Sequence, residues 1–126
     1  MATRRMISDL VLGSDDFLDM PLSAQALYCH LILKADQWGF LSSVNSTRRQ
    51  IGATQADVDC LADNGFILRF PGTPTICITH WNMMNSLKEG RGAKSEFPER
   101  KLVRQDGGVY VLRNNGKDVL DDDDED

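Results

Sequence analysis

The sequence has little of what marks membrane, secreted or metal-binding proteins. No apolar run approaches the roughly 18 residues that a membrane-spanning helix needs, and the first residues lead into no apolar segment of a signal peptide. The three cysteines, Cys29, Cys60 and Cys77, are an odd set spaced too widely for a paired metal-binding motif. We therefore expect a cytoplasmic protein with reduced thiols and no membrane span.

Catalytic patterns are missing as well. The sequence holds no Gly-rich phosphate loop, no paired catalytic carboxylates and no Ser/His/Asp set. Neither His30 nor His80 has a second ligand at metal-binding spacing. Cys29 and His30 do not form a nucleophile pair, because neighbours on a helix point about 100° apart. We expect no enzymatic activity, no metal and no cofactor.

Basic residues are not in excess either. The chain of 126 residues has 14 Lys and Arg against 19 Asp and Glu, a net charge of −5. Six of the negative charges lie in residues 121–126, so the rest of the chain carries +1. We expect this end to be a disordered acidic tail. It either solubilises the chain or competes, as a flexible anion, for a basic segment of the protein or for a partner's nucleic-acid groove.

The centre of the chain carries the pattern of two short helices joined by a turn. The first is predicted over 44–51 with Ser43 as its cap. The second is predicted over about 55–64, and Thr54 and Asp57 have the spacing of a capping box that begins it.

Strand formers follow this pair of helices. Residues 66–70 and 76–81 are predicted strands, separated by a loop over 71–75 whose prolines and glycine cannot continue a ladder. Phe40-Leu41 is short, and we expect it to be a third strand of the same sheet. The prediction is an α+β fold, a winged helix-turn-helix with three helices, a small antiparallel wing and extensions at both ends.

The longest helix precedes this unit. Ser23 is its predicted N-cap, and Gly39 is predicted to end it after Trp38. We expect Trp38 and Trp81 to anchor the core or the hairpin and not to stack on bases. The residues expected to face the core are Ala24, Leu27, Tyr28, Leu31 and Ala35, with Ile32 beside them.

The whole chain divides into four predicted parts. In the N-terminal arm, Phe17, Leu18 and Met20 are expected to cover one end of the core. In the linker after the domain, a strand over 109–112 has no evident partner within the domain. We therefore expect a dimer or higher oligomer through segments outside 22–81. The parts are an N-terminal arm (1–21), a winged-helix domain (22–81), a basic linker with a short strand (82–112) and a disordered acidic tail (113–126).

Several of these segments together resemble a known family. They are Arg5-Met6-Ile7-Ser8, Asp16-Phe17 followed by Leu22-Ser23, Ala35-Asp36 followed by Gly39-Phe40, and Ile78-Thr79-His80-Trp81 leading to Asn85, Lys88 and Arg91. Over about residues 4–112 the chain resembles the N-terminal winged-helix domain of phage and prophage replisome organisers. These are replication initiation proteins related to the bacterial primosome protein with the same domain.

The resemblance implies a winged helix that self-associates in the bacterial host cell, binds origin or single-stranded DNA, and recruits a replicative helicase or its loader. The chain departs from the family after the tryptophan. Its linker, with Glu89-Gly90-Arg91-Gly92, is less basic than is usual there, and it leads to an acidic tail.

The charge of the predicted recognition helix does not favour duplex DNA. A winged helix normally presents this helix to the major groove. Here its outward positions carry Asp57, Asp59 and Asp63 and no Lys or Arg, whereas DNA affinity depends on phosphate neutralisation. Gln55 is able to read adenine. The candidates for DNA contacts, each with plain surface exposure as its alternative, are Arg4, Arg5, Arg48, Arg49, Gln55, Arg69, Lys88, Arg91 and Lys94.

Two functions remain open. The first is a phage replication initiation protein that binds single- or double-stranded DNA and recruits a helicase or loader. The second is a protein-binding winged helix, such as a phage-encoded inhibitor of a host nucleic-acid enzyme, whose acidic face of Asp57, Asp59 and Asp63 docks on a basic partner. A simpler interpretation makes Asp57 a helix cap, and Asp59 and Asp63 a solvated surface.

Overall fold

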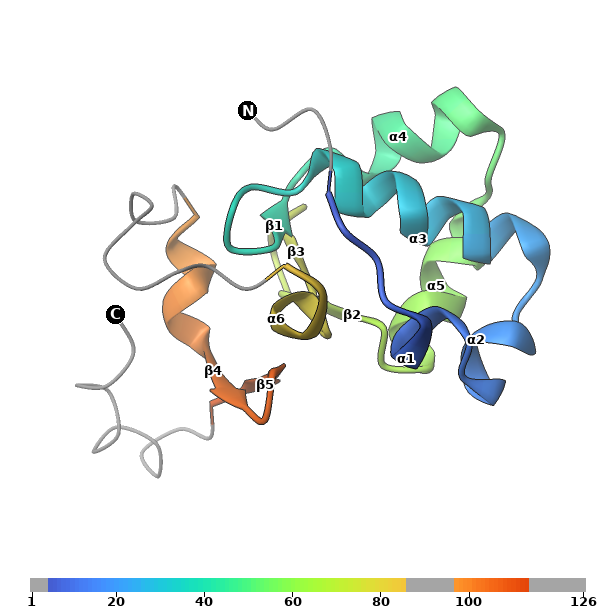
Figure 1. Cartoon of the computed structure of the whole chain (residues 1–126). Coiled ribbons are helices and arrows are strands. Elements are labelled where there is room, and N and C mark those ends of the chain that lie inside the picture. The colour runs from blue at the N-terminus through green and yellow to red at the C-terminus, as the bar shows by residue number, and fades with distance from the viewer. Residues whose placement is uncertain (1–4, 86–96, 114–126) are drawn as a thin grey trace.

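The computed structural model describes residues 5–85 and 97–113 (Figure 1). The predictions for Arg4, Lys88, Arg91, Lys94 and the acidic tail lie outside these residues. The described residues form a mixed α+β structure, as predicted. Its elements, in chain order, are α1 (Asp9–Leu12), α2 (Asp15–Leu18), α3 (Leu22–Lys34), β1 (Phe40–Leu41), α4 (Val44–Ile51), α5 (Gln55–Asp63), β2 (Ile67–Arg69), β3 (Ile76–Ile78), α6 (Trp81–Met84), the 3-10 helix η1 (Pro98–Leu102), β4 (Val103–Asp106) and β5 (Val109–Leu112).

The longest helix, α3, supplies the centre of the core, and its predicted inward face is confirmed. The prediction for its start is wrong. Pro21 precedes the first helical residue, so Ser23 lies inside the first turn, and its hydroxyl donates to a carboxylate oxygen of Asp57 at 2.7 Å. The inward residues, each at most 1% exposed, are Ala24, Leu27, Tyr28, Leu31, Ile32 and Ala35.

The predicted end of α3 is also wrong, because the helix stops at Lys34 and not at Gly39. The Asp36 carboxylate accepts hydrogen bonds from the backbone N–H groups of Trp38 and Phe40, which closes a turn directly after the helix. Gly39 lies in this turn with φ +92°, and a Cβ there would lie 2.6 Å from the Trp81 ring. The close approach of this ring therefore requires glycine.

The helix pair forms close to its predicted bounds. α4 matches the prediction, although Ser43 does not cap it with its side chain, because the backbone at this residue is not extended as in a capping residue. The capping box at the start of α5 is confirmed. The Thr54 hydroxyl accepts from the Asp57 N–H, and the Asp57 carboxylate accepts from the Thr54 N–H at 2.9 Å. Both helices pack on α3 (Figure 1).

The predicted three-stranded sheet is confirmed. It is antiparallel, in the order β1-β3-β2, with Phe40 opposite Cys77 in one pair of strands and Arg69 opposite Ile76 in the other. The second strand of the hairpin ends earlier than predicted, and Trp81 begins α6. The prediction of Trp81 as a core residue is confirmed, since it is 0% exposed and its indole N–H donates to the Gln37 carbonyl at 3.0 Å.

The strand over 109–112 has a partner, so the prediction that it lacks one is wrong. β5 pairs with β4 across Gly107-Gly108, whose positive φ angles suit a two-residue hairpin turn. The hairpin also docks on residues that flank the sheet, because the Tyr110 N–H donates to the Thr79 carbonyl, directly after β3, and its hydroxyl to the Trp38 carbonyl, just before β1, both at 2.8 Å. The core therefore includes Val103 and Tyr110, which follow the predicted winged-helix domain in the sequence.

The N-terminal arm covers one end of the core, as predicted, but with two of the three expected residues. Phe17 and Met20 are buried, and the Phe17 ring packs edge-on against Tyr28 and Phe66. Leu18 is 55% exposed. It follows Phe17 on a single helical turn, so the two side chains cannot both face the core.

Candidate functional site

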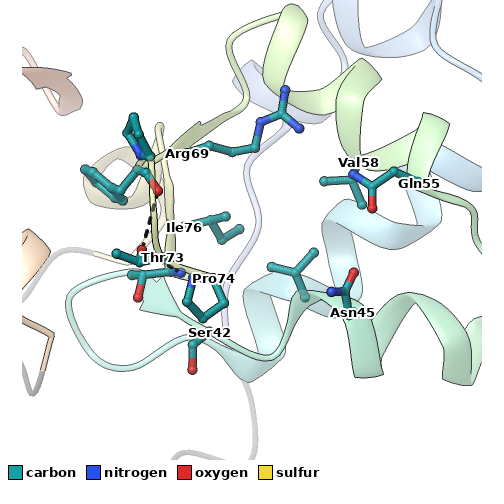
Figure 2. Close-up of a pocket in the computed structure, with 12 residues that line it drawn as sticks. Ser42, Asn45, Gln55, Val58, Arg69, Thr73, Pro74 and Ile76 are labelled. Carbon is teal, nitrogen blue, oxygen red and sulfur yellow. Dashed lines mark hydrogen bonds between the residues drawn. The ribbon is translucent and has the colours of Figure 1, made fainter.

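A groove lies between the start of α4, the start of α5 and the loop joining β2 to β3 (Figure 2). Its volume is about 380 Å³. Figure 2 shows Asn45 and Gln55 on the helix side and Thr73 and Pro74 on the loop side. The full lining is Ser42, Val44, Asn45, Gln55, Val58, Arg69, Phe70, Pro71, Thr73, Pro74, Thr75 and Ile76.

The groove has an apolar floor and a polar rim. Val44, Val58, Phe70 and Ile76 are core residues that reach its surface. The rim carries amides and hydroxyls together with the guanidinium of Arg69. Such a combination accepts a flat or aliphatic group on the floor and fixes its orientation through hydrogen bonds at the rim.

Local structure sets the direction of the two amides. Asn45 lies in the first turn of α4 and Gln55 in the first turn of α5, and both are exposed. Because α5 begins at the Thr54 capping box, Gln55 is held directly beside the turn that joins the helices. The chain thus presents two amide side chains from two helices to one groove.

Arg69 crosses from β2 to α5. Its Nη1 lies 2.7 Å from a carboxylate oxygen of Asp59, and the side chains are 44% and 49% exposed. The Gln55 amide donates to the same oxygen at 3.3 Å. The hydrogen bond from Arg69, followed by that from Gln55, lowers the pKa of Asp59. Asp59 therefore neutralises part of the positive charge that Arg69 brings to the groove.

Asp57 does not belong to the exposed surface, so its predicted outward position is wrong. It is 5% exposed, and its carboxylate accepts from the Thr54 N–H and from the Ser23 hydroxyl. The hydrogen bond from the Thr54 backbone is the main cause that lowers the pKa of Asp57. The acidic surface of α5 thus consists of Asp59 and Asp63.

The predicted basic residues do not all meet at the groove. Arg48 and Arg49 lie in the last turn of α4, and the Arg48 Nε donates to the Asn45 side chain at 3.1 Å, so Arg48 borders the rim. Arg5 is elsewhere. Its guanidinium donates to the Ala35 carbonyl at 3.1 Å and lies 5.1 Å from the centre of the Trp81 ring, which makes it a contact between the arm and the domain.

No family model, curated protein or solved structure matches this chain. The function of the groove is therefore inferred from its own residues.

Three exposed polar residues of the lining were not among the predicted site residues: Ser42, Asn45 and Thr73. Asn45 had a signal in the sequence, because it lies at the start of a predicted helix, as Gln55 does in the next one. Thr73 had none, since only the folded loop brings it opposite the helices.

Residues 5–85 and 97–113 contain neither a metal-binding cluster nor a membrane-spanning helix. These residues contain no cluster of three His, Cys, Asp or Glu side chains arranged to hold a metal ion. Within the same residues, no helix combines the length and apolar character needed to cross a bilayer.

Proposed function

We propose that this chain is a winged-helix module of a phage or prophage DNA replication initiation protein, acting in the cytoplasm of the bacterial host. The order helix, strand, helix, helix, strand, strand over α3 to β3, with β1 as the third strand of the sheet, supports a winged helix. In this proposal α4 and α5 are the helix-turn-helix, and the β2–β3 hairpin is the wing. The role is binding and assembly, with no catalytic step.

The observation that carries the DNA proposal is the convergence of Asn45, Gln55, Arg48 and Arg69 around one groove. Asn and Gln amides pair in a bidentate manner with adenine, and Arg side chains neutralise phosphates. The start of α5 enters the major groove in this arrangement, and the wing lies along the backbone. Recruitment of a helicase or loader, and self-association, belong to the same proposal through the family resemblance.

The test is fluorescence anisotropy of labelled single- and double-stranded DNA over a series of salt concentrations. We expect salt-sensitive binding. For Arg48→Ala with Arg49→Ala, the slope of log K against log salt should fall by about one for each phosphate that the variant no longer neutralises. Gln55→Ala reduces discrimination at an adenine by about 1–3 kcal/mol. Lys101→Ala, an exposed cation on η1, is the matched control and leaves binding unchanged.

A separate double variant, Lys88→Glu with Arg91→Glu, tests the predicted basic linker. We expect it to weaken DNA binding. If the intact protein stays folded and binds neither form of DNA at low salt, the proposal is wrong.

A second function, an acidic face that docks on a basic protein partner such as a host nucleic-acid enzyme, is favoured by the exposure of Asp59 and Asp63. One double variant, Asp59→Asn with Asp63→Asn, separates the two functions. It removes the negative charge that neutralises Arg69 and a second negative charge beside it on α5, so DNA affinity rises if the groove binds DNA. Capture of the protein partner falls if the acidic face is the interface. Asp106→Asn, an exposed carboxylate on β4, is the control for net charge.

A further inference from the structure

The face of α3 that points away from the core carries a second apolar stripe. Leu22, Ala26, Cys29 and Leu33 follow one another at intervals of four, three and four residues. At about 100° per residue they fall within an arc of roughly 60°, opposite the buried face. Leu22 is 80% exposed and Leu33 is 46% exposed. A helix at the surface of a monomer normally shows polar residues on this face.

The stripe is symmetric about its own centre. Two large residues, Leu22 and Leu33, end it, and two small ones, Ala26 and Cys29, lie between them. The intervals are the same in both directions along the helix. A two-fold axis through the centre of the stripe therefore places Leu22 against Leu33 of a second copy and Ala26 against Cys29 of that copy, which is the self-complementary contact of a two-fold dimer. The small central residues allow the two helices to approach closely.

Charge at the two ends of α3 favours the antiparallel arrangement. Asp15, Asp16 and Asp19 are exposed just before the helix begins, and Lys34 is exposed in its last turn. Antiparallel helices place Lys34 of one copy at the acidic end of the other and oppose their dipoles, whereas parallel helices would bring the three carboxylates of both copies together.

The sequence segments outside the described residues contain few apolar side chains that could cover the stripe. Residues 1–4, 86–96 and 114–126 contain few large apolar residues, namely Met1, Leu87, Val119 and Leu120. None of these segments repeats apolar residues at helical spacing, so none offers a complementary stripe.

We propose that α3 pairs with α3 of a second copy, antiparallel, through Leu22, Ala26, Cys29 and Leu33. The pairing gives the self-association in the proposed function a surface within the domain, in place of the terminal segments expected from the sequence. It does not depend on DNA binding.

The first test is the mass of the full chain in solution, by light scattering over a concentration series. We expect a dimer for the unchanged protein and a two-fold lower mass at the same concentration for Leu33→Glu. Leu102→Glu, at a leucine on η1 that is 51% exposed, is the matched control and keeps the dimer. A monomer at high micromolar concentration, or a dimer that Leu33→Glu does not weaken, would overturn the proposal.

Two further variants test the geometry. Leu22→Lys combined with Leu33→Glu in the same chain restores the dimer, because position 22 of each copy meets position 33 of the other in the antiparallel pair alone.

Ala26→Cys gives a disulfide between position 26 and Cys29 of the second copy when oxidised glutathione accepts the two electrons and two protons of the thiols. Ala26→Cys with Cys29→Ser forms no such bond. A linkage confined to identical positions would contradict the proposed pairing.

DNA binding by the same variants is measured in parallel. Loss of the dimer by Leu33→Glu with retained DNA binding supports the pairing and leaves the proposed function standing. A dimer without DNA binding would count against the proposed function alone.

Discussion

Replacement of Asp57 by alanine is the sharpest test of how α5 is built. The side chain is 5% exposed, and its carboxylate accepts from the Thr54 N–H at 2.9 Å and from the Ser23 hydroxyl at 2.7 Å. Removal of a capping side chain costs about 0.5–2 kcal/mol, and a hydrogen bond to a charged group contributes about 1.5–3 kcal/mol. Because the two effects overlap at one residue, we expect Asp57→Ala to lower the free energy of unfolding by about 2–4 kcal/mol.

The assay is urea denaturation followed by the fluorescence of Trp38 and Trp81. A decrease of this size lowers Tm by roughly 10 °C in a chain of this length. The matched control is Asp63→Ala, an exposed carboxylate of the same helix, which we expect to change the free energy of unfolding by less than about 0.5 kcal/mol. If both variants were destabilised equally, the assignment of Asp57 as a structural cap would be wrong.

The pH dependence gives an independent check on Asp57. Its pKa in the folded protein is lowered from an ordinary value of 3.8. The stabilisation by its carboxylate is therefore fully present above that value and is lost as the pH falls through the folded-state pKa. The difference in stability between the unchanged protein and Asp57→Ala should shrink in acid, whereas a constant difference down to low pH would refute the ionised carboxylate as its cause.

Three further predictions concern the core. Gly39→Ala forces a Cβ into the Trp81 ring at a positive φ, and we expect a destabilisation of more than about 1 kcal/mol in urea denaturation. Burial lowers the pKa of His80, so the free energy of unfolding falls as the pH drops below 6.5, and His80→Gln should flatten this fall in urea denaturation. The guanidinium carbon of buried Arg100 lies 5.0 Å from the centre of the Trp38 ring and 5.5 Å from the centre of the Tyr110 ring. Arg100→Gln should cost about 1–3 kcal/mol and speed hydrogen exchange in β4 and β5.

The structural role of Asp57 affects how the two proposed functions can be tested. A triple replacement of the three carboxylates of α5 would unfold the helix start together with any interface. The double variant of Asp59 and Asp63 avoids this, because both side chains reach solvent and neither caps a helix.

The capping box at Thr54, the bounds of α4 and the hairpin after α5 were predictable from the sequence. Each depends on residues within a few positions of one another, through backbone hydrogen bonds, turn chemistry and apolar periodicity. The core face of α3 was predictable for the same reason, since its spacing alone fixes which residues share one side. The sequence also contains the apolar residues on the opposite side of α3, but it does not show that they are exposed.

The tertiary structure alone decided how the charged groups of α5 and the groove are paired. Ser23 reaches Asp57 across 34 residues, and Arg69 reaches Asp59 across ten, so the sequence could present these four only as a cap, two carboxylates and a cation. It also decided that β5 pairs with β4 and docks on Thr79, because a hairpin and its docking site become neighbours only once the sheet exists. Local hydrogen bonding and periodicity thus determined the elements, and packing between distant segments determined the surface they present.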